Sequence, residues 1–197
     1  MKCVILALFL TPAAMAASIM LTMDEVPNQL IGGLVVGKGG IDFTFSSTIP
    51  TLRYDILSGL GAKTYVTDPI IEGNNSAFGV AFSVPVYDVQ FGFVVSSPTP
   101  IATMATVDLF NNSLVPFATI PLGSSLTDPF AEGQFNYSGP LPVTGIFITP
   151  TGDGFTAMGF DNLAVNATAE PVNLVLTSIG LAAFAILLRR RQLWSPK

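Results

Sequence analysis

Two short acidic clusters, one near each end of the predicted domain, carry the residue types with the clearest chemistry. Asp24 and Glu25 follow the N-terminal segment, and Asp161 and Asn162 lie in the last apolar run of the domain. If the first and last strands pair, these side chains meet, and oxygen ligands of this kind suit Ca²⁺. Glu25 and Asp161 are therefore candidate calcium ligands. In the alternative, which we favour, Asp161 and Asn162 hydrogen-bond the local backbone at a turn and no cofactor is bound.

Catalytic side chains are scarce in this sequence. It contains no histidine, and its single cysteine, Cys3, lies in the N-terminal segment. A Ser–His or Cys–His nucleophile pair therefore cannot form in the domain, and zinc lacks its usual nitrogen and sulfur ligands. Two carboxylate pairs could serve a glycosidase if they face each other at about 5–10 Å. These pairs are Glu72 with Asp88 and Asp128 with Glu132. We interpret them as surface carboxylates and expect no enzymatic activity.

The middle of the chain consists of short apolar runs separated by turn residues. From Ile41 to Val165, apolar side chains recur at every second position, and Gly, Pro, Asn, Ser and Asp interrupt the runs about every ten residues. This pattern is typical of antiparallel strands with one buried face. It predicts an all-β domain over residues 17–168, an antiparallel β-sandwich or jelly roll in which phenylalanine fills most of the core. The candidate strands are residues 41–47, 79–86, 88–95, 105–111, 114–120, 133–139, 144–150 and 155–166.

Two features interrupt these predicted strands. Pro85 has no backbone N–H to donate, so its strand is expected to lie at an edge or to contain a bulge at that point. Residues 141–145 are predicted to form a turn that leads into the strand around Ile146 and Ile148.

Charge is distributed unevenly along the chain. Between Ala17 and Pro171 there are three basic and thirteen acidic residues, which gives this part a net charge of −10. An acidic body repels phosphate backbones, so nucleic acid is excluded as an expected partner. The other basic residues lie in the two terminal segments.

The N-terminal segment has the composition of an export signal. It begins with Lys2, continues with an apolar run and ends with small residues in the Ala-x-Ala arrangement that signal peptidase accepts. Residues 1–16 are therefore predicted to be a secretory signal peptide, cleaved between Ala16 and Ala17. An exported domain without cysteine must be stabilised by burial and hydrogen bonding, which excludes the disulfide scaffolds.

The C-terminal segment is predicted to be a membrane helix. Residues 172–188 form a run of 17 residues without a charge. That length is near the lower limit for crossing a hydrocarbon core of about 30 Å. Arg189, Arg190 and Arg191 follow, and the positive-inside rule places them, together with the tail 192–197, in the cytoplasm.

Residues 169–191 resemble the sorting signal of the PEP-CTERM proteins of Gram-negative and related bacteria. In that family a Pro-Glu-Pro motif precedes a short transmembrane helix and a cluster of arginines. Glu170 and Pro171 match the second and third positions of the motif, and Ala169 stands where the first proline is usual. The resemblance implies a transient or lasting single-pass anchor that is processed by a membrane enzyme of the exosortase type.

The domain itself resembles the phenylalanine-rich sandwich domains that often precede this signal, in which a Phe-Asp-Asn-Leu sequence, here residues 160–163, closes the last strand. Such proteins are exported to the cell surface or to an exopolysaccharide matrix. The resemblance therefore implies a structural or adhesive protein associated with polysaccharide. The alternative is a secreted carbohydrate-binding or carbohydrate-active protein. The aromatic candidates for a sugar site in the domain are Tyr54, Tyr65, Tyr87 and Tyr137.

Overall fold

The computed structural model describes residues 17–25, 27–48, 53–55, 64–126, 130–152 and 156–167. Within these ranges all regular elements are β-strands, and all strand pairs are antiparallel. The predicted all-β antiparallel class is thus confirmed. No helix in the described part is long and apolar enough to cross a membrane. The predicted signal peptide, sorting segment, apolar helix and cytoplasmic tail lie outside the described residues.

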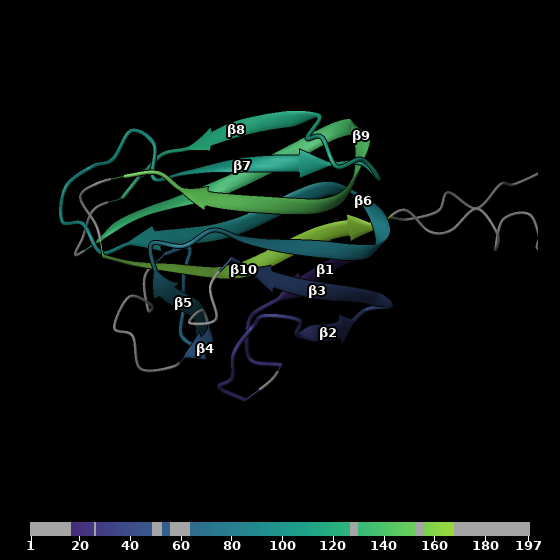
Figure 1. Ribbon diagram of the computed structural model, residues 1–197, viewed down its shortest axis with the longest axis horizontal. Coiled ribbons are helices and arrows are strands. Elements are labelled where there is room, and N and C mark those ends of the chain that lie inside the picture. Colours follow the sequence, from purple (N-terminus) through teal and green to yellow (C-terminus); the bar gives the residue numbers. More distant parts are fainter. Residues whose placement is uncertain are drawn as a thin grey trace, which may run out of the picture. The chain divides into compact units, whose positions relative to one another are not determined.

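Ten strands form one continuous sheet within the compact unit Ala17–Ala167 (Figure 1). In chain order they are β1 (Ala17–Leu21), β2 (Val35–Lys38), β3 (Ile41–Ser47), β4 (Arg53–Asp55), β5 (Ile70–Asn74), β6 (Phe78–Val95), β7 (Ala105–Phe110), β8 (Ala118–Leu122), β9 (Ala131–Pro150) and β10 (Ala157–Ala167). The prediction for residues 41–47 coincides with β3. The predicted strands 79–86 and 88–95 are joined in β6, and 133–139 and 144–150 are joined in β9.

The long strands β6 and β9 double back on themselves, and this converts the single sheet into two packed layers (Figure 1). Phe78 begins β6, and Phe93 lies 15 residues further along it, a span of about 50 Å in a straight strand. Yet Phe160, which pairs with Phe93, has its ring only 5.2 Å from the ring of Phe78. The two halves of β6 therefore face each other across the core, which is the arrangement of a β-sandwich.

The first layer contains β8, β7, the second half of β9, the first half of β6, β3 and β2, in that order. The second layer contains the first half of β9, the second half of β6 and β10. Along the outer side of β10 lie β1 at one end and β5, followed by β4, at the other.

The bend between the layers coincides with a break in the β6–β9 register. The pairing passes from Ala81↔Gly145 to Val86↔Val143 and then to Asp88↔Ser138. Pro85 lies inside this shift, so the bulge predicted for it is confirmed. The turn predicted at residues 141–145 is wrong, because these residues lie within β9, where Val143 and Gly145 pair with β6 on either side of the register shift.

Phenylalanine rings fill the core between the layers. The ring of Phe91 lies 4.9 Å from Phe135, with which it is stacked, and 4.9 Å from Phe160. Phe160 also contacts Phe78 in the opposite layer. These four side chains are at most 2% exposed, and such pairs add about 0.5–1.5 kcal/mol beyond the burial of their area. The predicted phenylalanine core is confirmed.

Candidate functional site

A groove of about 290 Å³ lies on the outer face of the first layer. Its floor is made of small residues on adjacent strands, namely Gly79 and Ala81 on β6 and Gly145 on β9. These positions alternate along their strands with the buried Val80 and Ile146, which face the core. Because no long side chain rises from the floor, the surface is hollow at this point.

Aromatic and aliphatic side chains form the walls of the groove. Phe147 on β9 and Phe110 at the end of β7 are both half-buried, and Leu114 in the loop that follows is 99% exposed. The two phenylalanines are exceptions to the prediction that this residue type faces the core. They give the groove apolar faces on which a flat ligand can pack.

Hydroxyl groups lie among these apolar walls. Ser46, Ser113 and Thr144 line the groove. Thr144 is held in place because its Oγ1 accepts the backbone N–H of Asn112 at 2.8 Å and donates to the carbonyl of Phe110 at 3.3 Å. The described residues of the groove carry no formal charge. The groove is therefore suited to a neutral ligand that has both apolar faces and hydroxyl groups.

The sequence did not point to this groove. Of the four tyrosine candidates, Tyr65, Tyr87 and Tyr137 are half-buried elsewhere, and the side chain of Tyr54 lies outside the described residues. The hydroxyl of Tyr137 donates to the carbonyl of Leu141 at 3.2 Å. The sequence signal that could have indicated the groove was the presence of small residues, Gly79, Ala81 and Gly145, at outward positions on neighbouring strands.

The outer face of the second layer carries a buried carboxylate that holds the segment 64–66. Glu132 on β9 is 1% exposed, so its interpretation as a surface carboxylate is wrong. Its carboxylate accepts the backbone N–H groups of Thr64 at 3.2 Å, Tyr65 at 2.5 Å and Val66 at 2.6 Å. Hydrogen bonds to a charged group are worth about 1.5–3 kcal/mol each. Glu132 therefore fixes a segment that is distant from it in the sequence.

Asp161 on β10 is a second buried carboxylate on this face, and only half of it is hydrogen-bonded. Its Oδ2 accepts the backbone N–H of Thr67 at 2.9 Å and the hydroxyl of the same residue at 3.1 Å. Its Oδ1 is buried and has no hydrogen-bond partner. Burial raises the pKa of Asp161 to about 6, and the negative charge of Asp24 adds to the rise, whereas hydrogen bonds from Thr67 and Asn162 oppose it.

The predicted meeting of the two acidic clusters depends on the pairing of the first and last strands, and that pairing is present. β1 pairs with β10, with Leu21 opposite Leu163. Residues 22–25 therefore follow β1 at the end of the ladder where Asp161 and Asn162 lie. Asp24 is close enough to Asp161 to act on its charge.

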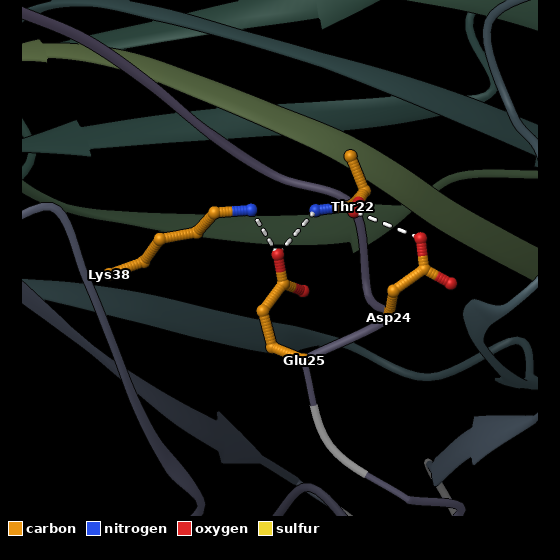
Figure 2. A network of polar contacts seen from close by, with 4 residues as sticks. All are labelled: Thr22, Asp24, Glu25 and Lys38. Atoms are coloured by element: carbon orange, nitrogen blue, oxygen red, sulfur yellow. Dashed lines mark hydrogen bonds and ion pairs between the residues drawn. The ribbon is translucent and has the colours of Figure 1, made fainter.

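Glu25 is bonded through one of its two oxygens (Figure 2). Oε1 forms an ion pair with Lys38 and accepts the backbone N–H of Thr22 at 3.3 Å. Partial burial raises the pKa of Glu25, but the hydrogen bonds from Lys38 and Thr22 outweigh this effect, so the net pKa lies below the ordinary value. Oε2 is buried without a partner.

The alternative interpretation, in which Asp161 and Asn162 bond the local backbone at a turn, is incomplete, because Asp161 accepts the backbone N–H of Asn162 but both side chains also bond a distant segment. Thr67, the main partner of Asp161, lies 94 residues earlier in the chain. The amide of Asn162 donates to the carbonyl of Tyr65, 97 residues earlier, at 2.9 Å. Both side chains therefore secure a long-range contact.

The carboxylate pairs considered for glycoside hydrolysis do not form a site in the described part of the chain. Glu72 pairs with Gly159 and Asp88 with Asn166, at opposite ends of β10 and on opposite sides of it. The separation along β10 alone is about 20 Å, well beyond the distance that such a pair requires. Asp128 lies outside the described residues.

The described part of the chain is an all-β sandwich with an uncharged groove on its surface. Comparison with solved structures finds several variants of CBM29-2, a family 29 carbohydrate-binding module, and two of them illustrate the degree of similarity. One has a TM-score of 0.37 and 10% identity, covering 71% of this chain and 91% of that chain. The other has a TM-score of 0.37 and 12% identity, covering 75% and 93%.

A third similar structure contains the CBM22-1 and GH10 modules of a Clostridium thermocellum xylanase complexed with xylohexaose. Its TM-score is 0.33 at 9% identity, with 78% of this chain and 26% of that chain covered. No protein-family model and no curated protein sequence matches this chain. At such low similarity the ligands of these proteins are not assigned to this one.

Proposed function

We propose that this chain is an exported, non-catalytic β-sandwich protein that binds a neutral polysaccharide in the groove of its first layer. The observation that carries the proposal is the composition of the groove. A floor of small residues lies beside Phe110 and Phe147, with hydroxyl groups at its margin. A sugar ring has an apolar face, which packs on such a surface, and hydroxyl groups at its edge, which hydrogen-bond to serine and threonine.

The size and charge of the groove limit the kinds of ligand that it can bind. Its volume of about 290 Å³ is at the lower end of the usual range for ligand pockets, so it accommodates part of a polymer and not a large compact ligand. Its described lining is uncharged, and the body of the protein is acidic. A neutral glycan is therefore favoured over uronic-acid polymers, which the negative surface repels.

The proposed location of the protein rests on the sequences of its two ends. A signal peptide over residues 1–16 and a PEP-CTERM-like segment over residues 169–191 would deliver the sandwich to the cell surface or to an extracellular matrix. In that setting, binding of a matrix polysaccharide gives the protein a structural or adhesive role. Signal peptidase and an exosortase-type enzyme are the proposed processing partners.

The test is affinity electrophoresis of the full chain, purified in detergent, through gels that contain a galactomannan, a mixed-linkage glucan or alginate. We expect at least one neutral polysaccharide to slow migration and alginate to have no effect. Phe147→Ala should weaken the interaction about tenfold, or about 1.4 kcal/mol. Ala81→Leu should weaken it as well, because Ala81 is exposed in the groove floor and a larger side chain fills the hollow.

Phe117→Ala is the matched control. Phe117 is a half-buried aromatic residue that packs near Tyr137, with 6.1 Å between the rings, and it is not among the groove residues. It should bind like the unmodified chain. The proposal fails if no neutral polysaccharide retards the protein, or if the Phe117 and Phe147 variants lose binding equally.

A further inference from the structure

The loop that joins β7 to β8, residues 111–117, exposes two neighbouring apolar side chains (Figure 1). Leu114 is 99% exposed and Val115 is 70% exposed. Single exposed apolar residues are common on protein surfaces, so the exposure alone assigns no role. The two residues differ in position, however, because Leu114 lines the groove of the first layer and Val115 does not. Leu114 is therefore a side chain that a ligand in the groove can cover.

Hydrogen bonds hold the first part of this loop beside β9. Oγ1 of Thr144 accepts the backbone N–H of Asn112 at 2.8 Å. Asn112 has a φ of 61°, in the left-handed region, which asparagine adopts more readily than most residues. Further along, Oγ of Ser113 accepts the backbone N–H of Val115 at 3.1 Å. The loop is therefore positioned before a ligand arrives, which lowers the entropy cost of binding.

Phe147 forms the opposite wall of the groove. It lies two residues after Gly145 on β9 and on the same face of the sheet. Thr144, to which the loop is bonded, lies immediately before Gly145. The floor residue Gly145 is therefore located between Phe147 and the loop that carries Leu114. A ring placed on this floor has an aromatic surface on one side and the side chain of Leu114 on the other.

We propose that Leu114 is a specificity-determining residue, which together with Phe147 encloses a sugar ring that is apolar on both faces. This inference rests on the proposed binding of a neutral polysaccharide in the groove. A ring whose hydroxyl groups are all equatorial exposes only C–H groups on its two faces. Glucose in β linkage has this form, whereas mannose carries an axial hydroxyl at C2 and galactose carries one at C4. The ligand class is therefore a β-linked glycan of all-equatorial rings, such as a β-glucan.

An axial hydroxyl group would weaken this enclosure. It points from the face of the ring toward Phe147 or Leu114, whose side chains offer it no hydrogen-bond partner. Burial of a hydroxyl group without a partner is unfavourable. Equatorial hydroxyl groups point outward from the rim of the ring, where Ser46, Ser113 and Thr144 can supply partners. The apolar walls therefore select against mannose and galactose rings.

The experiment is isothermal titration of the full chain, purified in a detergent without a sugar head group, with two unbranched β-1,4-linked hexasaccharides. One consists of glucose and the other of mannose, so they differ only in the orientation of the hydroxyl at C2. We expect the glucose hexasaccharide to bind about tenfold more tightly. Equal affinity for the two, or tighter binding of the mannose hexasaccharide, overturns the proposal.

Leu114→Ser should weaken binding of the glucose hexasaccharide about tenfold, because the ligand buries part of the apolar area of Leu114. It should affect the mannose hexasaccharide less and so reduce the preference between the two. Val115→Ser is the matched control, since it makes a similar change one residue away, in the same loop and outside the groove. Both side chains are exposed, so both variants should keep the Tm of the unmodified chain.

Failure of this inference can be distinguished from failure of the proposed function. If the glucose hexasaccharide binds and Phe147→Ala weakens it, but Leu114→Ser binds like Val115→Ser, the groove binds glycan without Leu114 and only this inference is wrong. If neither hexasaccharide binds, this inference is also wrong. Retardation of the chain by another neutral polysaccharide then decides whether the proposed function stands.

Discussion

Two buried carboxylates, those of Glu132 and Asp161, hold one segment of this domain in place by accepting its backbone hydrogen bonds. Glu132 accepts three consecutive backbone N–H groups, and Asp161 accepts the next one in the chain. Residues 64–67 therefore have their backbone donors satisfied by side chains instead of by a ladder. Backbone groups that are buried without such partners would be strongly destabilising. Two side chains thus take the place of a strand pairing over this segment.

At this scale we predict that Glu132→Gln destabilises the protein by about 2–3 kcal/mol. The substitution removes the negative charge and directs an amide N–H₂ group toward backbone donors. Urea denaturation measures the loss, and limited proteolysis should show earlier cleavage near residues 64–67. Asp42→Asn, at an exposed position on β3, is the control and should be nearly neutral. Equal stabilities of the two variants would contradict this role of Glu132.

At the scale of elements, the second half of β6 packs closely against the segment around Tyr65. Gly92 occupies the point of closest approach, where an added Cβ would meet the carbonyl oxygen of Tyr65 at 2.0 Å and its carbon at 2.6 Å. On the neighbouring strands, Gly92 pairs with Asp161 and with Gln134. Glycine is therefore needed here for space between backbones.

Gly92→Ala should cost about 2–4 kcal/mol, because the segment at Tyr65 must move away and weaken its bonds to Glu132 and Asp161. The free energy of unfolding in guanidinium chloride measures the effect. Gly32→Ala is the comparison, since an added Cβ at Gly32 has nothing within 4 Å. It should change stability by less than about 1 kcal/mol. Similar losses in both variants would mean that the close approach at Gly92 is not responsible.

At the scale of the whole molecule, the sandwich contains the proposed binding groove, and the two ends of the chain are proposed to direct its export. The core between the layers is continuous, with Phe160 joining rings from both halves of β6. Such a core stabilises the domain by burial without disulfides. The proposed sorting segment follows it in the sequence.

Processing can be tested by mass spectrometry of the protein recovered from the surface of a host that contains an exosortase. We expect a mature C-terminus near Glu170 and Pro171, without Arg189–Arg191. Replacement of Glu170 and Pro171 by alanine should lead to accumulation of the unprocessed chain in the membrane. Ala169→Pro completes a Pro-Glu-Pro motif and should be processed at least as well as the natural sequence. Recovery of surface protein that still carries the arginines would rule out processing.

The alternation of apolar and polar residues was sufficient to predict the β class, the phenylalanine core and the position of β3, and the missing backbone N–H of Pro85 predicted the irregularity there. These features are local, because the faces of a strand are set by a period of two residues. Short strands were missed: β1, β2, β4 and β5 each have five residues or fewer, and within such lengths alternation is hardly distinguishable from chance. β5 also buries two successive residues, Ile70 and Ile71, which breaks the pattern.

The candidate site was predicted in part. The sequence predicted that two acidic clusters would meet if the first and last strands pair, namely Asp24 with Glu25 and Asp161 with Asn162. The pairing of β1 with β10 brings their segments to the same end of a ladder. Their partners could not be foreseen, because Thr67 and Tyr65 come from a segment without a strand pattern. The groove was missed because its floor consists of residues with little or no side chain, which gives weak signals in a sequence.

The sequence by itself therefore determined the β class and the buried faces of the longer strands, whereas the tertiary structure decided which strands are neighbours and where β6 and β9 bend back. Alternation specifies the face of a strand but not its partner, since the energy of pairing comes from contacts between residues far apart in the chain. The groove on β6 and β9 and the contact of Asp161 with Thr67 both depend on such long-range contacts.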